Sequence, residues 1–233
     1  MVNAFDKNLS SQEWYEKHYS KINVSGNIES FFHRKLHSLM EINTAPKSGI
    51  RILEVGGNLG EHIPFVKDSW AEYILTDVRE PDLQIQSHLK SINVRFKVAD
   101  VQKLQFESDY FDRVIATCLF HHIENPLSGF TEMLRVTKPG GKITILIPND
   151  PGLFYTFIHK FTTLQRAKRA GMLQEAKLFH ATEHRNHYCS LMTFAKYAFL
   201  DHSVKLRGYP FFGDFYNLNA LTVLEITKVS PKI

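Results

Sequence analysis

A chain of 233 residues with 43% hydrophobic and 22% charged residues can bury a full core, which excludes a disordered protein. Its two cysteines are too few for a disulfide framework and favour a reducing compartment. A formal net charge of +4 is modest for a surface that tracks nucleic acid.

The placement of apolar and charged residues narrows the class further. The first forty residues have no apolar core of the kind that a signal peptide needs, and runs such as 143–147 are too short to cross a bilayer. We therefore expect a cytoplasmic protein. The net positive charge lies between residues 151 and 190, where six Lys or Arg accompany two Glu.

Strands and helices alternate along the chain. A lead helix is predicted at 28–42, where apolar residues recur at helical spacing. Five strands are predicted at 51–55, 73–76, 94–98, 111–117 and 142–147. Between the last two, Asn125 suits the N-cap of a helix that has Pro126 in its first position and ends at a turn at Pro139 and Gly140. Such alternation is typical of a parallel sheet covered by helices.

The last part of the chain is expected to close the sheet. Ser190 is a candidate cap for a helix over 191–200, and two strands are predicted at 204–206 and 221–227. The connection between these strands is too short for a crossover helix, so we expect an antiparallel pair.

The stretch "ILEVGGNLG" places three glycines directly after the first strand. Gly56, Gly57 and Gly60 follow neither the P-loop nor the G-x-G-x-x-G spacing. In a doubly wound sheet, ligands bind at this position, and glycine lets the backbone approach them closely. Glu54, beside the loop, would repel a pyrophosphate and favour a cation.

Two more acids follow the next strands. Asp77 comes after the second strand, where a carboxylate can accept from both hydroxyls of a ribose. Asp100 comes after the third strand, where it can accept from an adenine amine. Acids at three successive strand ends suit a cationic nucleoside without phosphates, and S-adenosylmethionine is such a ligand.

The order of these motifs resembles a known family. The segments "ILEVGGNLG", "VADVQKLQF", "SDYFDRVIATCLFHHI" and "EMLRVTKPGGKITILIPN", within 51–149, are similar to the successive motifs of class I S-adenosylmethionine-dependent methyltransferases of the small-molecule, type 11-like branch. The resemblance implies an α/β, Rossmann-like doubly wound sheet with helices on both faces. It also implies a mostly parallel sheet with an antiparallel last strand and the strand order 3-2-1-4-5-7-6.

One residue departs from the family pattern, which usually has a glycine at the position of Asn58. Because Asn adopts left-handed backbone more readily than most residues, we expect it to be tolerated.

The resemblance also implies the cofactor contacts, although glycines after a strand often only form turns and acids there often cap helices. The implied residues are Glu54, Gly56 and Gly60 for the methionine part, Asp77 for the ribose, Asp100 and Val101 for the adenine, and the backbone near Thr117 and Cys118.

Histidines supply the candidates for the acceptor side. The segment "ATEHRNHYCS" resembles the stretch that faces the acceptor in many small-molecule methyltransferases, which makes His184 the first candidate for a general base. Arg185, His187 and Tyr188 are substrate candidates from the same segment, with a solvated polar loop as the alternative. His121, at the end of the fourth strand, is a second catalytic candidate, with a role in shaping the cofactor site as its alternative.

Three histidines also recur at a spacing that zinc ligands can have, namely His180, His184 and His187. Apart from Glu183, no cluster of Cys or carboxylate residues accompanies them. We therefore expect no metal site.

Residues 151–172 combine an apolar, aromatic face with a basic tail. Three interpretations stay open: a lid over an anionic acceptor, a helix on a membrane surface, or a helix packed on the domain with its charges in water. The aromatic residues at 211–216 are expected at the same end of the sheet, as a pocket wall or as packing.

These observations divide the chain into a helical lead (1–50), a cofactor-binding core (51–150), a basic substrate cap (151–189) and a C-terminal helix with closing strands (190–233). We interpret it as a methyltransferase that uses S-adenosylmethionine to methylate an oxygen of a small, sugar-like or anionic molecule, such as a phosphorylated or lipid-linked saccharide. The confinement of the basic residues argues against the alternative acceptor, nucleic acid. A non-catalytic binding protein of the same fold is the other alternative. The sequence makes no prediction of the oligomeric state.

Overall fold

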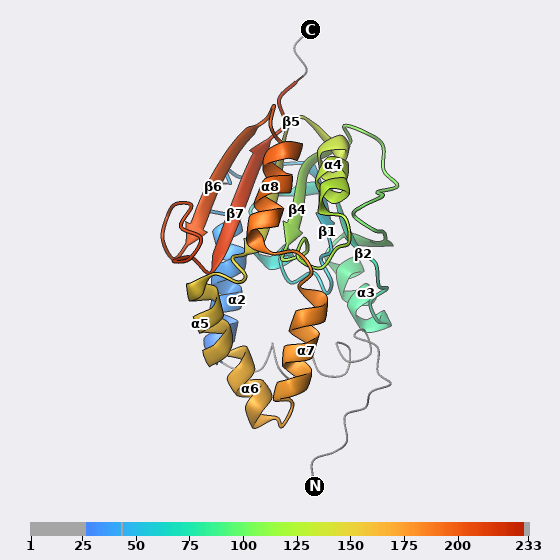
Figure 1. The fold of residues 1–233 in the computed structure, drawn as a ribbon. Helices are drawn as coiled ribbons and strands as arrows, with labels where there is room; N and C mark the ends of the chain where they lie inside the picture. Colours follow the sequence, from blue (N-terminus) through green and yellow to red (C-terminus); the bar gives the residue numbers. More distant parts are fainter. Residues whose placement is uncertain (1–26, 43, 231–233) are drawn as a thin grey trace.

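A computed structural model describes residues 27–42 and 44–230, in which a mixed sheet lies between helices on both of its faces (Figure 1). The strands are β1 (Ile50–Val55), β2 (Trp70–Asp77), β3 (Val94–Val98), β4 (Phe111–Thr117), β5 (Thr137–Pro148), β6 (Ser203–Tyr209) and β7 (Leu221–Thr227). The helices are α2 (Asn27–Met40), α3 (Leu83–Ser91), α4 (Pro126–Val136), α5 (Leu153–Phe161), α6 (Thr163–Arg169), α7 (Leu173–Glu183) and α8 (Tyr188–Ala198).

The strand order is β3-β2-β1-β4-β5-β7-β6. Strands β1 to β5 pair in parallel, and β7 pairs antiparallel with both β5 and β6. The predicted fold class, the strand order and the antiparallel closing pair are therefore confirmed. The chain order reverses between β1 and β4, and the carboxyl ends of these two strands open at the edge where ligands bind in such sheets.

Two apolar cores, one on each face, hold the sheet. Neighbouring side chains of β1 point to opposite faces, so Ile52 packs in one core and Leu53 in the other. The core with Leu53 includes Phe130 of α4 and Leu191 of α8, while the core with Ile52 includes Met40 of α2. The lead helix is thus fixed to the sheet by its last turn. Residues 1–26 of the predicted lead lie outside the described residues.

The sequence predicted N-caps for two helices, and one of the two is confirmed. Asn125 caps α4 as expected, and its Oδ1 accepts from the backbone N of Ser128 at 3.1 Å. The predicted cap at Ser190 is wrong, because α8 begins at Tyr188 with His187 in the N-cap position. The Ser190 hydroxyl lies within the first turn and donates back to the His187 carbonyl at 2.7 Å.

The predicted turn after α4 belongs to β5. Gly140 has the left-handed φ of +77° that a type II turn needs at this position. Thr137 and Lys142, on either side, nevertheless pair with β4, across an irregularity in the register.

Helices α5, α6 and α7 project from the edge of the sheet where the parallel strands end (Figure 1). They occupy most of the segment 151–187 that carries the net positive charge. Among the described residues, no helix has the length and apolar character needed to span a bilayer.

A buried ion network joins the lead helix to the sheet. Arg113 of β4 donates to Glu41, directly after α2, at 3.1 Å and to Asp68, before β2, at 2.8 Å. All three side chains are only 2% exposed. Burial alone would raise the pKa of Glu41, but hydrogen bonds from His62 and Arg113 outweigh burial and lower it to about 2. The network therefore holds the ionised Glu41 against the Arg113 guanidinium, which also donates to Asp68.

Replacing Arg113 by Leu is expected to destabilise the fold strongly, because it leaves two buried carboxylates without their cation. The expected loss is about 3–5 kcal/mol in the free energy of unfolding, measured by urea denaturation. Arg95→Leu is the matched control, since that side chain is 63% exposed and pairs with Glu72 at the surface. It should cost at most about 1 kcal/mol. Equal losses in the two variants would contradict this role of the network.

Candidate active site

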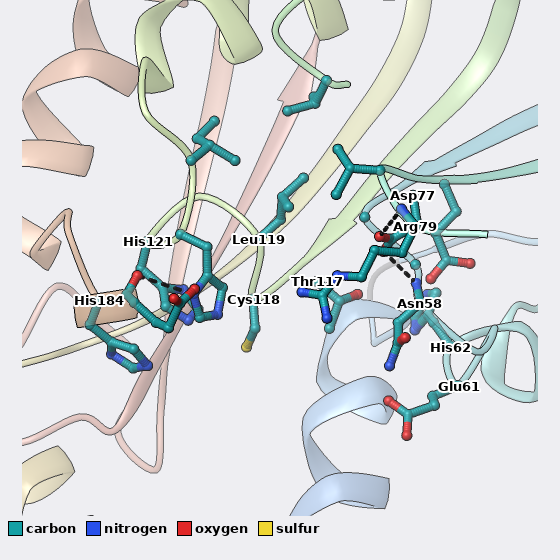
Figure 2. A pocket seen from close by; sticks show the side chains of 18 of the residues that line it. Asn58, Glu61, His62, Asp77, Arg79, Thr117, Cys118, Leu119, His121 and His184 are labelled. Carbon is teal, nitrogen blue, oxygen red and sulfur yellow. Dashed lines mark hydrogen bonds and ion pairs between the residues drawn. The ribbon is translucent and has the colours of Figure 1, made fainter. Parts of the chain in front are cut away.

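A pocket of about 580 Å³ opens where the parallel strands end, beneath α5 and α7. One end is lined by the glycine loop after β1 and by residues that follow β2 and β3. The other end is lined by histidines that follow β4 or belong to α5 and α7. Figure 2 shows the two ends, with Asp77 and Asn58 on one side, His121 and His184 on the other, and Cys118 between them.

The glycine loop brings the backbone to the floor of the pocket. Gly56 has a φ of +62° and lines the pocket together with Gly57 and Asn58. A Cβ atom on Gly57 would lie 2.1 Å from a methyl carbon of Leu75, so a larger residue there requires the buried Leu75 side chain to move. Asn58 has a φ of +46°, which confirms the expected left-handed conformation. Gly60 does not line the pocket, and its φ of +77° serves the turn behind the loop.

The three predicted acids line the same end. Asp77 accepts from the backbone N of Asn58 at 3.1 Å and of Arg79 at 3.2 Å, the contacts drawn in Figure 2. Asp100 accepts from the backbone N of Gln102 at 2.9 Å. The Gln102 side-chain amide also donates to both oxygens of Asp100 at 3.1 Å. Both oxygens of Asp77 and Oδ2 of Asp100 accept one hydrogen bond each, so both groups retain capacity to accept from a ligand.

Glu54 lies deeper than the other two acids. It is 1% exposed and accepts from the Tyr73 hydroxyl at 2.6 Å. Burial raises its pKa, while the charge of His62 and the Tyr73 hydrogen bond act in the opposite direction. A cation placed in the pocket beside Glu54 would favour the ionised form.

The predicted residues between the two ends also line the pocket, namely Val101, Thr117 and Cys118. Burial raises the pKa of Cys118 to about 12, so it is a neutral thiol at physiological pH. This excludes Cys118 as a thiolate nucleophile.

Five histidines gather at the other end, at positions 121, 122, 159, 180 and 184. The His184 ring lies 4.4 Å from that of His121 and 3.9 Å from that of His180, measured between centroids. Nδ1 of His184 is 2.7 Å from Oδ2 of Asp150, at the end of β5. An ionised carboxylate can only accept, so Nδ1 of His184 carries the proton and Nε2 carries a lone pair.

Burial favours the neutral form of His184 and His122. It lowers the pKa of His184, and the hydrogen bond to Asp150 offsets this only in part. Burial and the neighbouring His184 lower the pKa of His122 to about 4. Burial alone would raise the pKa of Asp150, but hydrogen bonds with His180 and His184 hold it below its usual range. At neutral pH the His122 and His184 rings are therefore neutral beside one ionised carboxylate.

His121 is the second predicted catalytic residue. It is 5% exposed, and burial lowers its pKa well below the ordinary value. Its Nδ1 atom is buried without a hydrogen-bond partner among the residues that the structure describes. A buried ring nitrogen of this kind is costly unless something in the pocket binds it.

The same side chains bring together enough ligand atoms for a metal ion. Those of Asp150, His180 and His184 lie within 4.8 Å of one another, as do those of His121, His122 and His184. Two donors on one tetrahedral zinc ion lie roughly 3.3 Å apart. Nε2 of His180 lies at this distance, 3.3 Å, from Oδ2 of Asp150. The 2.7 Å between the same oxygen and Nδ1 of His184 is instead a hydrogen-bond distance. In the described geometry, Asp150 and His184 form a carboxylate–imidazole pair.

The three substrate candidates after His184 do not line the pocket. Arg185 is exposed, and His187 occupies the N-cap position of α8. Tyr188 is buried and donates to Asp214 at 2.7 Å, on the loop between β6 and β7. The chain turns into α8 directly after His184, which carries these side chains away from the pocket.

Several lining residues were not predicted as site residues. Asp150 had a usable signal, because it follows β5 as Asp77 and Asp100 follow their strands. Leu36 and His37 of α2 had none, since only the docking of the lead helix brings them to the pocket. The remaining unpredicted lining residues with rings include His62, Tyr155, His159 and Phe179.

Residues 53–145 match the family of type 11 methyltransferase domains. The chain carries a class I S-adenosylmethionine-dependent methyltransferase domain of the type 11 branch. S-adenosylmethionine is the cofactor of this family, as predicted from the sequence.

Curated relatives of the methyltransferase domain include enzymes of quinone biosynthesis. A demethylmenaquinone methyltransferase of Clavibacter sepedonicus is 33% identical over 103 residues, which cover 43% of this chain and 42% of that protein. A ubiquinone/menaquinone biosynthesis C-methyltransferase of Coxiella burnetii is 30% identical over 118 residues, which cover 46% of each chain. This chain therefore spans somewhat less than half the length of these relatives.

A solved structure shares the fold over nearly the whole chain. It is a S-adenosylmethionine-dependent methyltransferase of Thermotoga maritima, with a TM-score of 0.61 and 15% identity. The match covers 94% of this chain and 100% of that one.

Proposed function

We propose that this protein transfers a methyl group from S-adenosylmethionine to a small hydroxylated aromatic molecule held against His184. The observation that carries the proposal is the division of one pocket, with acids at one end and a carboxylate–imidazole pair at the other. Methyl transfer from a sulfonium is an in-line displacement, so a pocket that holds both reactants in contact supplies much of the rate.

The cofactor is assigned to the end that carries the acids. Asp77 accepts from the ribose hydroxyls, and Asp100 with Val101 holds the adenine. Glu54, through the loop of Gly56 and Gly57, attracts the cationic methionine part. The backbone around Thr117 and Cys118 lies between the cofactor and the acceptor. Gly60 acts only through the shape of the loop.

The acid–base role is assigned to His184. Its Nε2 lone pair takes the proton of an acceptor hydroxyl, while Asp150 stabilises the imidazolium that forms. The unpartnered Nδ1 of His121 offers a second polar contact to the acceptor. Both residues keep the catalytic roles expected of them, and Asp150 joins them as a positioning residue.

The walls of the acceptor end favour a neutral ring over an anion. Among the described residues that line the pocket, the one Lys or Arg is Arg79, at the cofactor end beside Asp77. The acceptor end has rings instead, from Tyr155, Phe179 and the histidines. The sugar-like or anionic acceptor expected from the sequence has no matching cation in this lining.

If the acceptor hydroxyl is on an aromatic ring, removal of its proton by His184 also allows a ring carbon to accept the methyl group. Loss of its proton to His184 spreads negative charge onto the ring carbon beside it, which attacks the methyl group. The S–CH₃ bond breaks, S-adenosylhomocysteine leaves, and the ring carbon then loses its own hydrogen as a proton. The names of the two quinone-pathway relatives support carbon as the acceptor atom.

Binding of the cofactor is the first test. Calorimetric titration of S-adenosylmethionine and S-adenosylhomocysteine should show binding of both, weakened about ten- to a hundredfold in Asp77→Asn by loss of charged hydrogen bonds. Asp201→Asn, an exposed acid away from the pocket, is the matched control and should bind like the wild type. Lack of binding at millimolar ligand would leave a non-catalytic protein of this fold.

Two neighbouring histidines provide the test of the base. His184→Asn should lower kcat by about 10²–10⁴-fold with cofactor affinity unchanged, measured as transfer of a labelled methyl group to reduced naphthoquinones and simple phenols. His187→Asn should stay near the wild type, because His187 does not line the pocket. Equal losses in both variants would remove His184 from the proposed role.

The pH profile reports the state of His184, which faces Asp150, Glu183, His121, His122 and His180. Because burial lowers its pKa, kcat/KM should stay on its plateau at neutral pH and fall only below the ordinary histidine value of about 6.5. Asp150→Asn removes the carboxylate that partly restores this pKa, so the acidic limb should move to still lower pH. The assignment would be contradicted if the acidic limb of the kcat/KM profile lay above the ordinary histidine pKa. It would also be contradicted if Asp150→Asn left the position of that limb unchanged.

A further inference from the structure

Helix α5 has two faces with different surroundings. Tyr155 and His159 line the acceptor end of the pocket. Leu153, Phe157 and Phe161, four residues apart, lie on another face and are 71%, 58% and 54% exposed. The Phe157 and Phe161 rings lie 4.5 Å apart between centroids, so this face is a continuous apolar strip.

The loop between β6 and β7 extends this strip. Phe154 N donates to the Asn217 carbonyl at 3.0 Å, which fixes the start of α5 against the loop, as their neighbouring positions in Figure 1 show. Phe211, Phe212 and Phe215 on the same loop are 51%, 76% and 51% exposed. The aromatic surface is the set of Leu153, Phe157, Phe161, Phe211, Phe212 and Phe215.

The charges around the aromatic surface are mostly positive. Lys160 lies within the strip, with its Nζ 6.0 Å from the centre of the Phe161 ring, and Lys168 and Arg169 are exposed at the end of α6. Within α5, α6 and the β6–β7 loop, all of them described, the one carboxylate is Asp214. It is already hydrogen-bonded to Tyr188.

We propose that the aromatic surface seats the protein on a membrane that contains anionic lipids. Exposed aromatic residues are suited to the boundary between acyl chains and headgroups. The flanking Lys and Arg are suited to the negative charge of the lipids. The apolar groups stand on two separate projections, a helix and a hairpin loop, which can enter a deformable headgroup layer together. The proposed contact is one of side chains that enter the headgroup layer, and no described helix has the length and apolar character needed to span a bilayer.

The position of α5 gives this contact a consequence for the site. The helix that rests on the membrane through Phe157 also lines the pocket through Tyr155 and His159. An apolar acceptor would reach His184 beside α5 without crossing bulk water. The membrane contact itself does not depend on the acceptor proposed above.

Vesicle sedimentation tests the proposal without cofactor or acceptor. The full chain should bind vesicles of phosphatidylcholine with about a third phosphatidylglycerol more tightly than pure phosphatidylcholine, and high salt should weaken the binding. The double variant Phe157→Ser, Phe212→Ser should bind at least about tenfold more weakly, because two exposed rings no longer enter the bilayer. Lys168→Glu with Arg169→Glu should lose a similar factor on the anionic vesicles alone.

Leu200→Ser is the matched control, since Leu200 is 78% exposed but follows α8, away from the aromatic surface. It should bind like the wild type, and circular dichroism should show the same fold in all variants. No vesicle binding, or binding that the Phe variants leave unchanged, would overturn the proposal. So would a dimer in sedimentation equilibrium that the Phe variants dissociate while vesicles stay unbound, because the surface would then join two copies of this chain.

Discussion

Parallel pairing of β1 to β5 is the constraint on which the rest of the structure depends. It brings the carboxyl ends of these strands to one edge, and the chemistry-bearing residues follow those ends. Asp77 is the last residue of β2, His121 follows β4 and Asp150 follows β5. The parallel pairing alone therefore brings residues that are distant in the sequence into one pocket.

Two additions to the sheet close that pocket. The lead helix α2 is locked to β4 by the buried Arg113 network, and it places Leu36 and His37 against the pocket. On the other side, α5 and α7 bring histidines over the end of β5. The hydrogen bond between Asp150 and His184 joins the end of β5 to the end of α7, and it fixes which nitrogen of His184 carries the proton.

The sequence predicted the features that local rules determine. Alternating apolar runs predicted the strands, and acids after strands predicted Asp77 and Asp100 as lining residues. The family resemblance predicted His184. Arg185, His187 and Tyr188 were also expected on the acceptor side, but they do not line the pocket. The side-chain direction changes where α8 begins, two residues before the expected cap at Ser190. The contribution of α2 depends on tertiary packing, for which a single sequence has no local signal.

The most direct test of the central claim is a crystal structure of the protein with S-adenosylhomocysteine. The account predicts the adenine beside Asp100, the ribose on Asp77 and the sulfur directed toward the imidazole of His184, with room between them for an acceptor. A ligand bound elsewhere, or one whose sulfur points away from His184, would contradict the division of the pocket into a cofactor end and an acceptor end.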